Sequence, residues 1–146
     1  AFGPIASRFA MECSIHDQQV KPKALILVSK PGHCLNDLLY RTSSGSLGLE
    51  VAGIVSNHPD QQALAEFYNH DYHHLPVTPE TKADQEAKIR ALIDETGADL
   101  IVLARYMQIL TPEMCAYLSG RCINIHHSFL PGEPCAHAGG YGTDRP

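Results

Sequence analysis

The sequence predicts an α/β protein built on a Rossmann-like, doubly wound parallel sheet. Short apolar runs alternate with amphipathic stretches, and the strand-like runs recur at intervals of roughly 20 to 25 residues. Such alternation is typical of parallel strands joined by right-handed helical crossovers. At 146 residues, the chain has the length of one domain.

Five strands are predicted from apolar runs that are bounded by polar or turn residues, at 24–29, 50–56, 73–77, 99–103 and 122–125. Helices are expected at 2–15, 33–42, 60–69 and 79–96, and a short one follows Thr111. Asp60 and Thr111 are the expected N-caps, and Gly97 is placed to close the long helix. Ligands of an open parallel sheet bind outside the carboxyl ends of its strands, so the residues that follow each strand are the candidate site.

Composition excludes several classes of partner. The formal net charge is −5 and no cluster of Lys or Arg is present, which argues against nucleic acid. No apolar run approaches the roughly 20 residues that cross a bilayer, and the first residues lack a signal-peptide pattern. The five cysteines are scattered and include no Cys-x-x-Cys pair, which suits a reducing compartment. We therefore expect a cytoplasmic protein with neither a nucleic-acid nor a membrane partner.

The stretch at 123–131, Ile-Asn-Ile-His-His-Ser-Phe-Leu-Pro, is the main candidate site. Alternation along the last strand brings Asn124 and His126 to the same side. An amide can donate a hydrogen bond to a carbonyl oxygen that becomes an oxyanion, and an imidazole can polarise that oxygen or move a proton. The residue types alone also fit a turn-capping Asn124 and a surface imidazole at His126 or His127.

The exact string favours the chemical interpretation, because Asn-x-His-x-Ser-x-Leu-Pro resembles the signature of the formyltransferase family that uses 10-formyltetrahydrofolate. The matching positions are Asn124, His126, Ser128, Leu130 and Pro131. The resemblance implies the formyltransferase fold. It also implies that Asn124 binds the developing oxyanion, that His126 polarises the formyl group or shuttles protons, and that Ser128 shapes the pocket.

The stretch at 105–110, Arg-Tyr-Met-Gln-Ile-Leu, resembles the folate-binding loop of the same family. The resemblance implies that the substrate is bound by Arg105, Tyr106, Met107, Gln108, Ile109 and Leu110. Met107, Ile109 and Leu110 would form an apolar wall for the pterin, and the main chain of Gln108 would supply polar contacts. Without the neighbouring signature, the same stretch would be interpreted as a hydrophobic plug under a loop.

The loop after the first strand separates the branches of the family. The glycinamide ribonucleotide transferases hold the phosphate of their acceptor in a Gly-rich loop, whereas residues 29–36 here contain one glycine and a proline, a poor phosphate nest. The pattern instead resembles the deformylase branch, in which water replaces the amine. This implies hydrolysis of 10-formyltetrahydrofolate to tetrahydrofolate and formate for one-carbon and purine metabolism. The folate is the substrate, no cofactor is expected, and His33 would line the formyl pocket.

The resemblance also implies three segments. Residues 1–20 would be a connector from an absent ACT-type domain, 21–132 a partial catalytic domain, and 133–146 a tail that does not match the family. The catalytic aspartate of the family lies on a later loop, and Asp144 falls in that tail, so Asp144 takes no role. We expect the C-terminal strands to be missing through a frame error or gene truncation near residue 133. The chain would then be weakly stable and nearly inactive, and a homo-oligomer is expected only of the full-length protein.

Other interpretations remain beside this one. The chain could transfer the formyl group to an amine, or it could be an inactive folate-binding remnant. The residues around His70 and His74 suggest a metal site, but they fall across a helix end and a strand start, so no metal is assigned. His33 and Cys34 would need a placed base and an oxyanion hole to act as a nucleophile pair.

Overall fold

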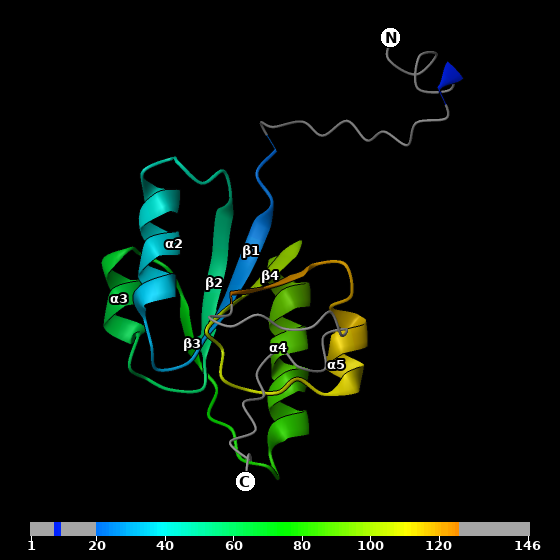
Figure 1. Ribbon diagram of the computed structural model, residues 1–146. Coiled ribbons are helices and arrows are strands. Elements are labelled where there is room, and N and C mark those ends of the chain that lie inside the picture. Colours follow the sequence, from blue (N-terminus) through cyan, green and yellow to red (C-terminus); the bar gives the residue numbers. More distant parts are fainter. Residues whose placement is uncertain (1–7, 10–19, 126–146) are drawn as a thin grey trace, which may run out of the picture.

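The computed structural model describes residues 8–9 and 20–125, and residues 20–125 form a five-stranded sheet between two layers of helices (Figure 1). The strands are β1 (Lys23–Val28), β2 (Glu50–Ser56), β3 (Tyr72–His74), β4 (Leu100–Ala104) and β5 (Cys122–Ile125). The helices are α2 (His33–Ser43), α3 (Gln62–Phe67), α4 (Lys82–Thr96) and α5 (Pro112–Tyr117). The strand order is β3-β2-β1-β4-β5, and every pairing is parallel, which confirms the predicted sheet.

β1 occupies the centre of the sheet because it is apolar on both faces. All residues from Ala24 to Val28 are buried, and their side chains alternate between the two helical layers. Leu25 and Leu27 pack in the cluster that includes α4 and α5, whereas Ile26 packs in the cluster that includes α2 and α3. Figure 1 shows the two helix pairs on opposite sides of the strands.

Each long helix reaches the sheet through a narrow apolar stripe. Leu35 and Leu39 of α2, and Ile89 and Ile93 of α4, are fully or almost fully buried at helical spacing. Burying one such side chain stabilises a fold by about 1.5 to 3 kcal/mol relative to leaving it in water. Packing of these stripes orients both helices over the strands.

Two helix ends follow the sequence signals closely. Gly97 has a φ of 65° and ends α4 in the left-handed conformation that glycine adopts without strain. The Thr111 side chain accepts a hydrogen bond from the Met114 amide and caps α5, with Pro112 at the first helical position.

Other predicted boundaries are wrong. Asp60 does not cap α3, which begins at Gln62 with no side-chain cap bond. The long helix begins at Lys82 rather than at 79, because the Thr78 amide donates to the Thr81 hydroxyl in a turn that precedes it. β3 covers Tyr72–His74 instead of 73–77, so it ends two residues before Pro76.

Three expected segments lie outside the described residues, apart from Arg8, Phe9 and Val20. They are the helix over 2–15, the connector at 1–20 and the tail at 133–146. In the part of the chain that the structure describes, no helix combines the length and the hydropathy needed to cross a membrane.

Candidate active site at the carboxyl edge of the sheet

The loops that follow β1, β2 and β4 are tied together by one buried hydroxyl. Ser29 directly follows β1, and its Oγ donates a hydrogen bond to Asn57 Oδ1 at 2.8 Å. The same Oγ accepts a hydrogen bond from the Met107 amide at 2.9 Å. Ser29 is 3% exposed and Asn57 8%. The link joins loops that are 28 and 78 residues away from Ser29 in sequence.

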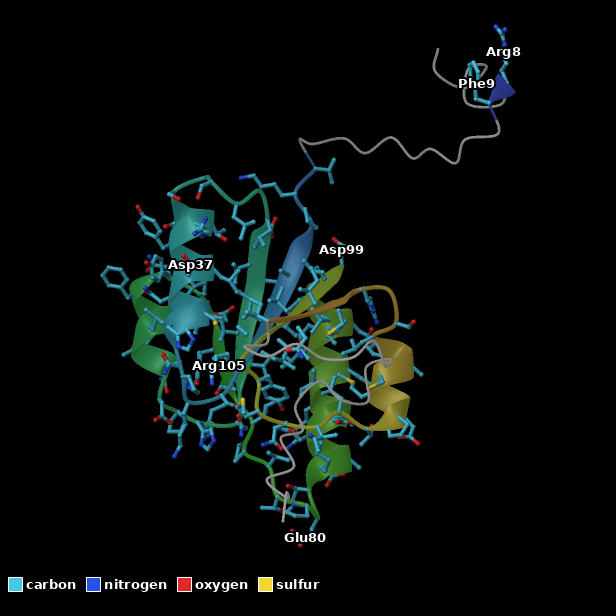
Figure 2. All side chains as sticks on the ribbon, viewed as in Figure 1. Arg8, Phe9, Asp37, Glu80, Asp99 and Arg105 are labelled. Carbon is cyan, nitrogen blue, oxygen red and sulfur yellow. The ribbon has the colours of Figure 1, made fainter. Side chains whose placement is uncertain are left out.

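The loop at 105–110 begins with an unusual backbone conformation. Arg105 has a φ of 56°, in the left-handed region that residues with a side chain rarely adopt. Its Nε is buried and has no hydrogen-bond partner among the described residues. Figure 2 shows Arg105 near the carboxyl end of the sheet. Asp99, which directly precedes β4, lies at the other end of that strand. The turn at Arg105 directs the chain away from β4.

Side chains of the predicted folate-binding loop divide between the core and the surface. Tyr106 and Leu110 belong to the buried cluster under α4 and α5. Met107 is 38% exposed and Ile109 55%. Two members of the expected apolar wall, Met107 and Ile109, are therefore available to the face of a ligand. Tyr106 and Leu110 can contact a ligand only through the main chain, because their side chains are occupied in the core.

Two neighbouring residues of α4 hold the two ends of this loop. The Tyr106 hydroxyl donates to Gln85 Oε1 at 3.2 Å. Thr111 donates from its amide to Glu86 Oε1 at 3.0 Å and from its hydroxyl to Glu86 Oε2 at 2.5 Å. Gln85 and Glu86 are almost fully buried, and Lys82 Nζ lies 3.6 Å from Glu86 Oε1. The loop is thus anchored to the helix layer at both ends.

The environment of Tyr106 predicts a loss of stability in alkali. Burial raises the pKa of its phenol well above the ordinary value of 10, against the lowering effect of its bond to Gln85. In the unfolded chain this phenol ionises near pH 10, whereas in the folded chain it stays neutral to a higher pH. The folded state therefore keeps its full stability below about pH 10 and loses stability as the pH rises above that value. We expect Tyr106→Phe to reduce the fall of the melting temperature as the pH rises above about 10. An equally steep fall in wild type and variant would show that Tyr106 is not the group responsible.

Asn124 lies one strand away from this loop. In β5 it pairs with Leu103 of β4, and paired residues of parallel strands share a face, so Asn124 is on the α4 and α5 side of the sheet. Its side chain is partly buried. His126 and Ser128 lie outside the described residues, and their convergence with Asn124 stays a prediction. His33 is exposed and begins α2, at the same edge as Ser29.

Four polar residues hold the loop. Ser29 and Asn57 lie in the post-strand segments expected to form the site, but their anchoring role was not predicted, and Gln85 and Glu86 were not predicted at all. Ser29 and Asn57 stand immediately after buried strands, which is a usable signal. Gln85 and Glu86 precede the buried Ile89 by four and three positions, on the stripe that faces the core. A polar residue at an apolar position of a helical pattern needs a buried partner, and here the partners are Tyr106 and Thr111.

Two hollows border α4 in the described part of the chain. One has a volume of about 280 Å³ and is lined by Ala83, Glu86, Ala87, Arg90, Thr111 and Glu113. The other has a volume of about 200 Å³ and is lined by His74, Leu75, Pro76, Thr81, Asp84, Gln85 and Lys88. Neither is lined by Asn124 or by residues 105–110, so neither belongs to the predicted site.

The histidine-rich stretch around β3 is not assembled as a metal site. Within residues 8–9 and 20–125, no group of three or more His, Cys, Asp or Glu side chains is arranged to hold a metal ion. Burial lowers the pKa of His70, and the neighbouring Asp71 opposes that shift.

Comparison with protein families identifies the family of this chain. The family model described as formyl transferase matches residues 22–139. The chain belongs to the formyl transferase family. The family resemblance inferred from the residues at 105–110 and 124–131 is thereby confirmed.

Several individual members of the formyl transferase family that this chain is similar to are deformylases. It is 50% identical over 130 residues to the formyltetrahydrofolate deformylase of Corynebacterium sp. strain P-1, covering 89% of this chain and 46% of the relative. It is 42% identical over 137 residues to the deformylase of Synechocystis sp. strain PCC 6803, covering 94% and 48%. The chain thus spans about half the length of these curated relatives.

Solved structures of the formyl transferase family have the same fold as this chain. The formyltetrahydrofolate deformylase of Burkholderia mallei superposes with a TM-score of 0.77 at 53% identity, covering 90% of this chain and 47% of that one. The phosphoribosylglycinamide formyltransferase of Coxiella burnetii superposes with a TM-score of 0.69 at 28% identity, covering 78% and 55%. The chain shares the fold with both and much more sequence with the deformylase.

Proposed function

We propose that this chain contributes the folate-binding loop and the oxyanion-binding amide of a 10-formyltetrahydrofolate hydrolase. The observation that carries the proposal is the loop at 105–110, which is anchored on three sides and leaves Met107 and Ile109 exposed beside Asn124's strand. A flat heteroaromatic ring needs such an apolar surface together with main-chain polar groups. The similarity to deformylases supports folate as the ligand.

In this proposal, water attacks the formyl carbon and the carbonyl oxygen becomes an oxyanion. The Asn124 amide donates a hydrogen bond to that oxygen, which stabilises the tetrahedral intermediate more than the substrate. His126 polarises the formyl group or moves the proton of the attacking water. The carbon–nitrogen bond then breaks, the nitrogen takes up a proton, and tetrahydrofolate and formate leave. The reaction needs no cofactor, and its proposed compartment is the cytoplasm.

The loop after β1 favours water over a phosphorylated amine as the acceptor. Pro31 has no N–H to offer a phosphate, and the Gln61 side chain packs over the loop and donates to the Lys30 carbonyl. A Cβ atom added at Gly32 would come within 2.1 Å of Gln61 Oε1, so this side chain occupies the space beside the glycine. The loop is therefore filled by the protein's own side chain at the point where the transferases hold phosphate.

The test measures formate release and folate binding separately. The chain is incubated with 10-formyltetrahydrofolate, with and without glycinamide ribonucleotide as the amine acceptor, and formate is quantified. Titration with tetrahydrofolate in a calorimeter reports binding. We expect tetrahydrofolate to bind and formate to appear without the amine, at a low rate that matches the weak activity expected of this chain.

Each other outcome rejects the proposal in a distinct way. Formyl transfer that requires the amine would identify a transferase. Binding without any formate above the buffer control would identify a folate-binding remnant. Absence of both binding and turnover would remove folate as the ligand of this chain.

A further inference from the structure

We propose that Ser29 is a positioning residue that sets the place of the folate-binding loop through its hydroxyl. The identity of the ligand rests on the proposed function, whereas the link itself rests on two hydrogen bonds and on burial. Ser29 follows β1, outside the loop at 105–110 and outside Asn124's strand.

The direction of the two hydrogen bonds gives each partner a distinct role. A serine hydroxyl has one proton and two lone pairs. Because the proton is donated to Asn57 Oδ1 at 2.8 Å, a lone pair is free for the Met107 amide at 2.9 Å. Among the described residues, the Asn57 side chain is connected to the loop through Ser29, whose hydroxyl rotation it fixes.

Burial makes this link hard for water to replace. Ser29 is 3% exposed and Asn57 8%, so a serine hydroxyl removed by mutation leaves a site with little access to solvent. The Met107 amide would then lose its acceptor in a partly buried setting, which is more costly than losing a fully solvated hydrogen bond.

Met107 is the point at which the link affects a ligand rather than only stability. The preceding Tyr106 side chain is fixed in the core through Gln85, and Met107 is the first residue of the loop that is largely exposed. The other end of the loop is held independently, by the bonds from Thr111 to Glu86. Loss of the Ser29 hydroxyl should thus release the Met107 end while the Thr111 end stays in place.

Ser56 provides a matched control. Ser56 is fully buried and ends β2, and Ser29 is similarly buried directly after β1. The Ser56 Oγ accepts a hydrogen bond from the His58 amide at 3.1 Å. That bond is local, between residues two positions apart, and no hydrogen bond described for Ser56 reaches the loop at 105–110. Ser56→Ala removes the same chemical group from a similar environment without breaking the link to Met107.

The experiment compares Ser29→Ala and Ser56→Ala by amide hydrogen exchange and by tetrahydrofolate titration. We expect Ser29→Ala to speed exchange at Met107 by about tenfold, with little change at Thr111, and to weaken tetrahydrofolate binding by a similar factor. Ser56→Ala should change neither quantity by more than about twofold. A general loss of stability would instead accelerate exchange at Met107 and Thr111 together.

Asn57→Ala tests the proposed order of action. The variant should reproduce part of the effect of Ser29→Ala, and the double variant should be no worse than Ser29→Ala alone, because Asn57 acts through the same hydroxyl. Asn57→Ala also serves as the test if Ser29→Ala fails to fold.

Two results would overturn the inference: unchanged exchange at Met107 in Ser29→Ala, or equal acceleration in Ser56→Ala. If wild type fails to bind tetrahydrofolate, the proposed function fails. Faster amide exchange at Met107 but not at Thr111 in Ser29→Ala would in that case still support the positioning role, since exchange is measured without ligand.

Discussion

Glu86→Ala should destabilise the fold by about 2 to 4 kcal/mol. Glu86 is 4% exposed, and its carboxylate accepts two hydrogen bonds from Thr111 and lies 3.6 Å from Lys82 Nζ. Its removal leaves three polar groups without their partner. Burial already lowers the pKa of Lys82, and the attraction of Glu86 opposes that shift, so the variant also leaves a half-buried ammonium less well compensated.

Chemical denaturation measures this effect, and Glu95→Ala is the control. Glu95 is an exposed carboxylate of the same helix, and its replacement should change the unfolding free energy by less than about 0.5 kcal/mol. Glu86→Gln keeps the shape and one acceptor, and it should fall between the two. Equal stability of Glu86→Ala and Glu95→Ala would show that the anchor at Thr111 contributes nothing to folding.

Asn124→Ala should slow formate release from 10-formyltetrahydrofolate by about a hundredfold to a thousandfold. The expected cause is the loss of the hydrogen bond to the oxyanion, which is stronger in the transition state than in the substrate. Tetrahydrofolate binding should be unchanged, because this product has no formyl oxygen for Asn124 to contact. Single-turnover formate release and calorimetric titration provide the two measurements.

Asn124→Asp is the sharpest companion variant. It keeps the size and shape of the side chain but replaces a donor with a charged acceptor, so it should be at least as slow as Asn124→Ala. Formate release within about threefold of wild type in either variant would contradict a role of Asn124 at the oxyanion. Circular dichroism should be unchanged, since Asn124 lies near the carboxyl end of β5 and is only partly buried.

Local sequence patterns determined the elements of this protein and the family to which they belong. The run from Ala24 to Val28 is apolar at every position because both of its faces are covered, and this identifies a central parallel strand without knowledge of its neighbours. Thr111 followed by Pro112, and Gly97 after a long helical pattern, placed two helix ends through contacts within one turn. The strings at 105–110 and 124–131 gave the family resemblance that the match over 22–139 confirmed.

Weaker local signals predicted a wrong helix start where a tertiary contact fixes the segment. Asp60 has the right side chain for an N-cap, yet α3 begins two residues later. In that segment the Gln61 side chain is bonded to the Lys30 carbonyl in the loop after β1, a partner 31 residues away. Rules based on neighbouring residues cannot predict that contact.

The sequence by itself thus determined which segments become strands and helices, that the strands run parallel, and which loops are candidates for the ligand. Only the tertiary structure decided how the loop at 105–110 is held, because its anchors Ser29, Gln85 and Glu86 lie 78, 21 and 25 residues from the groups that they bind. Those contacts depend on β1 lying between β2 and β4 and on α4 covering one face of the sheet. Strand order is set by the summed burial of all the elements, and no short stretch of sequence specifies it.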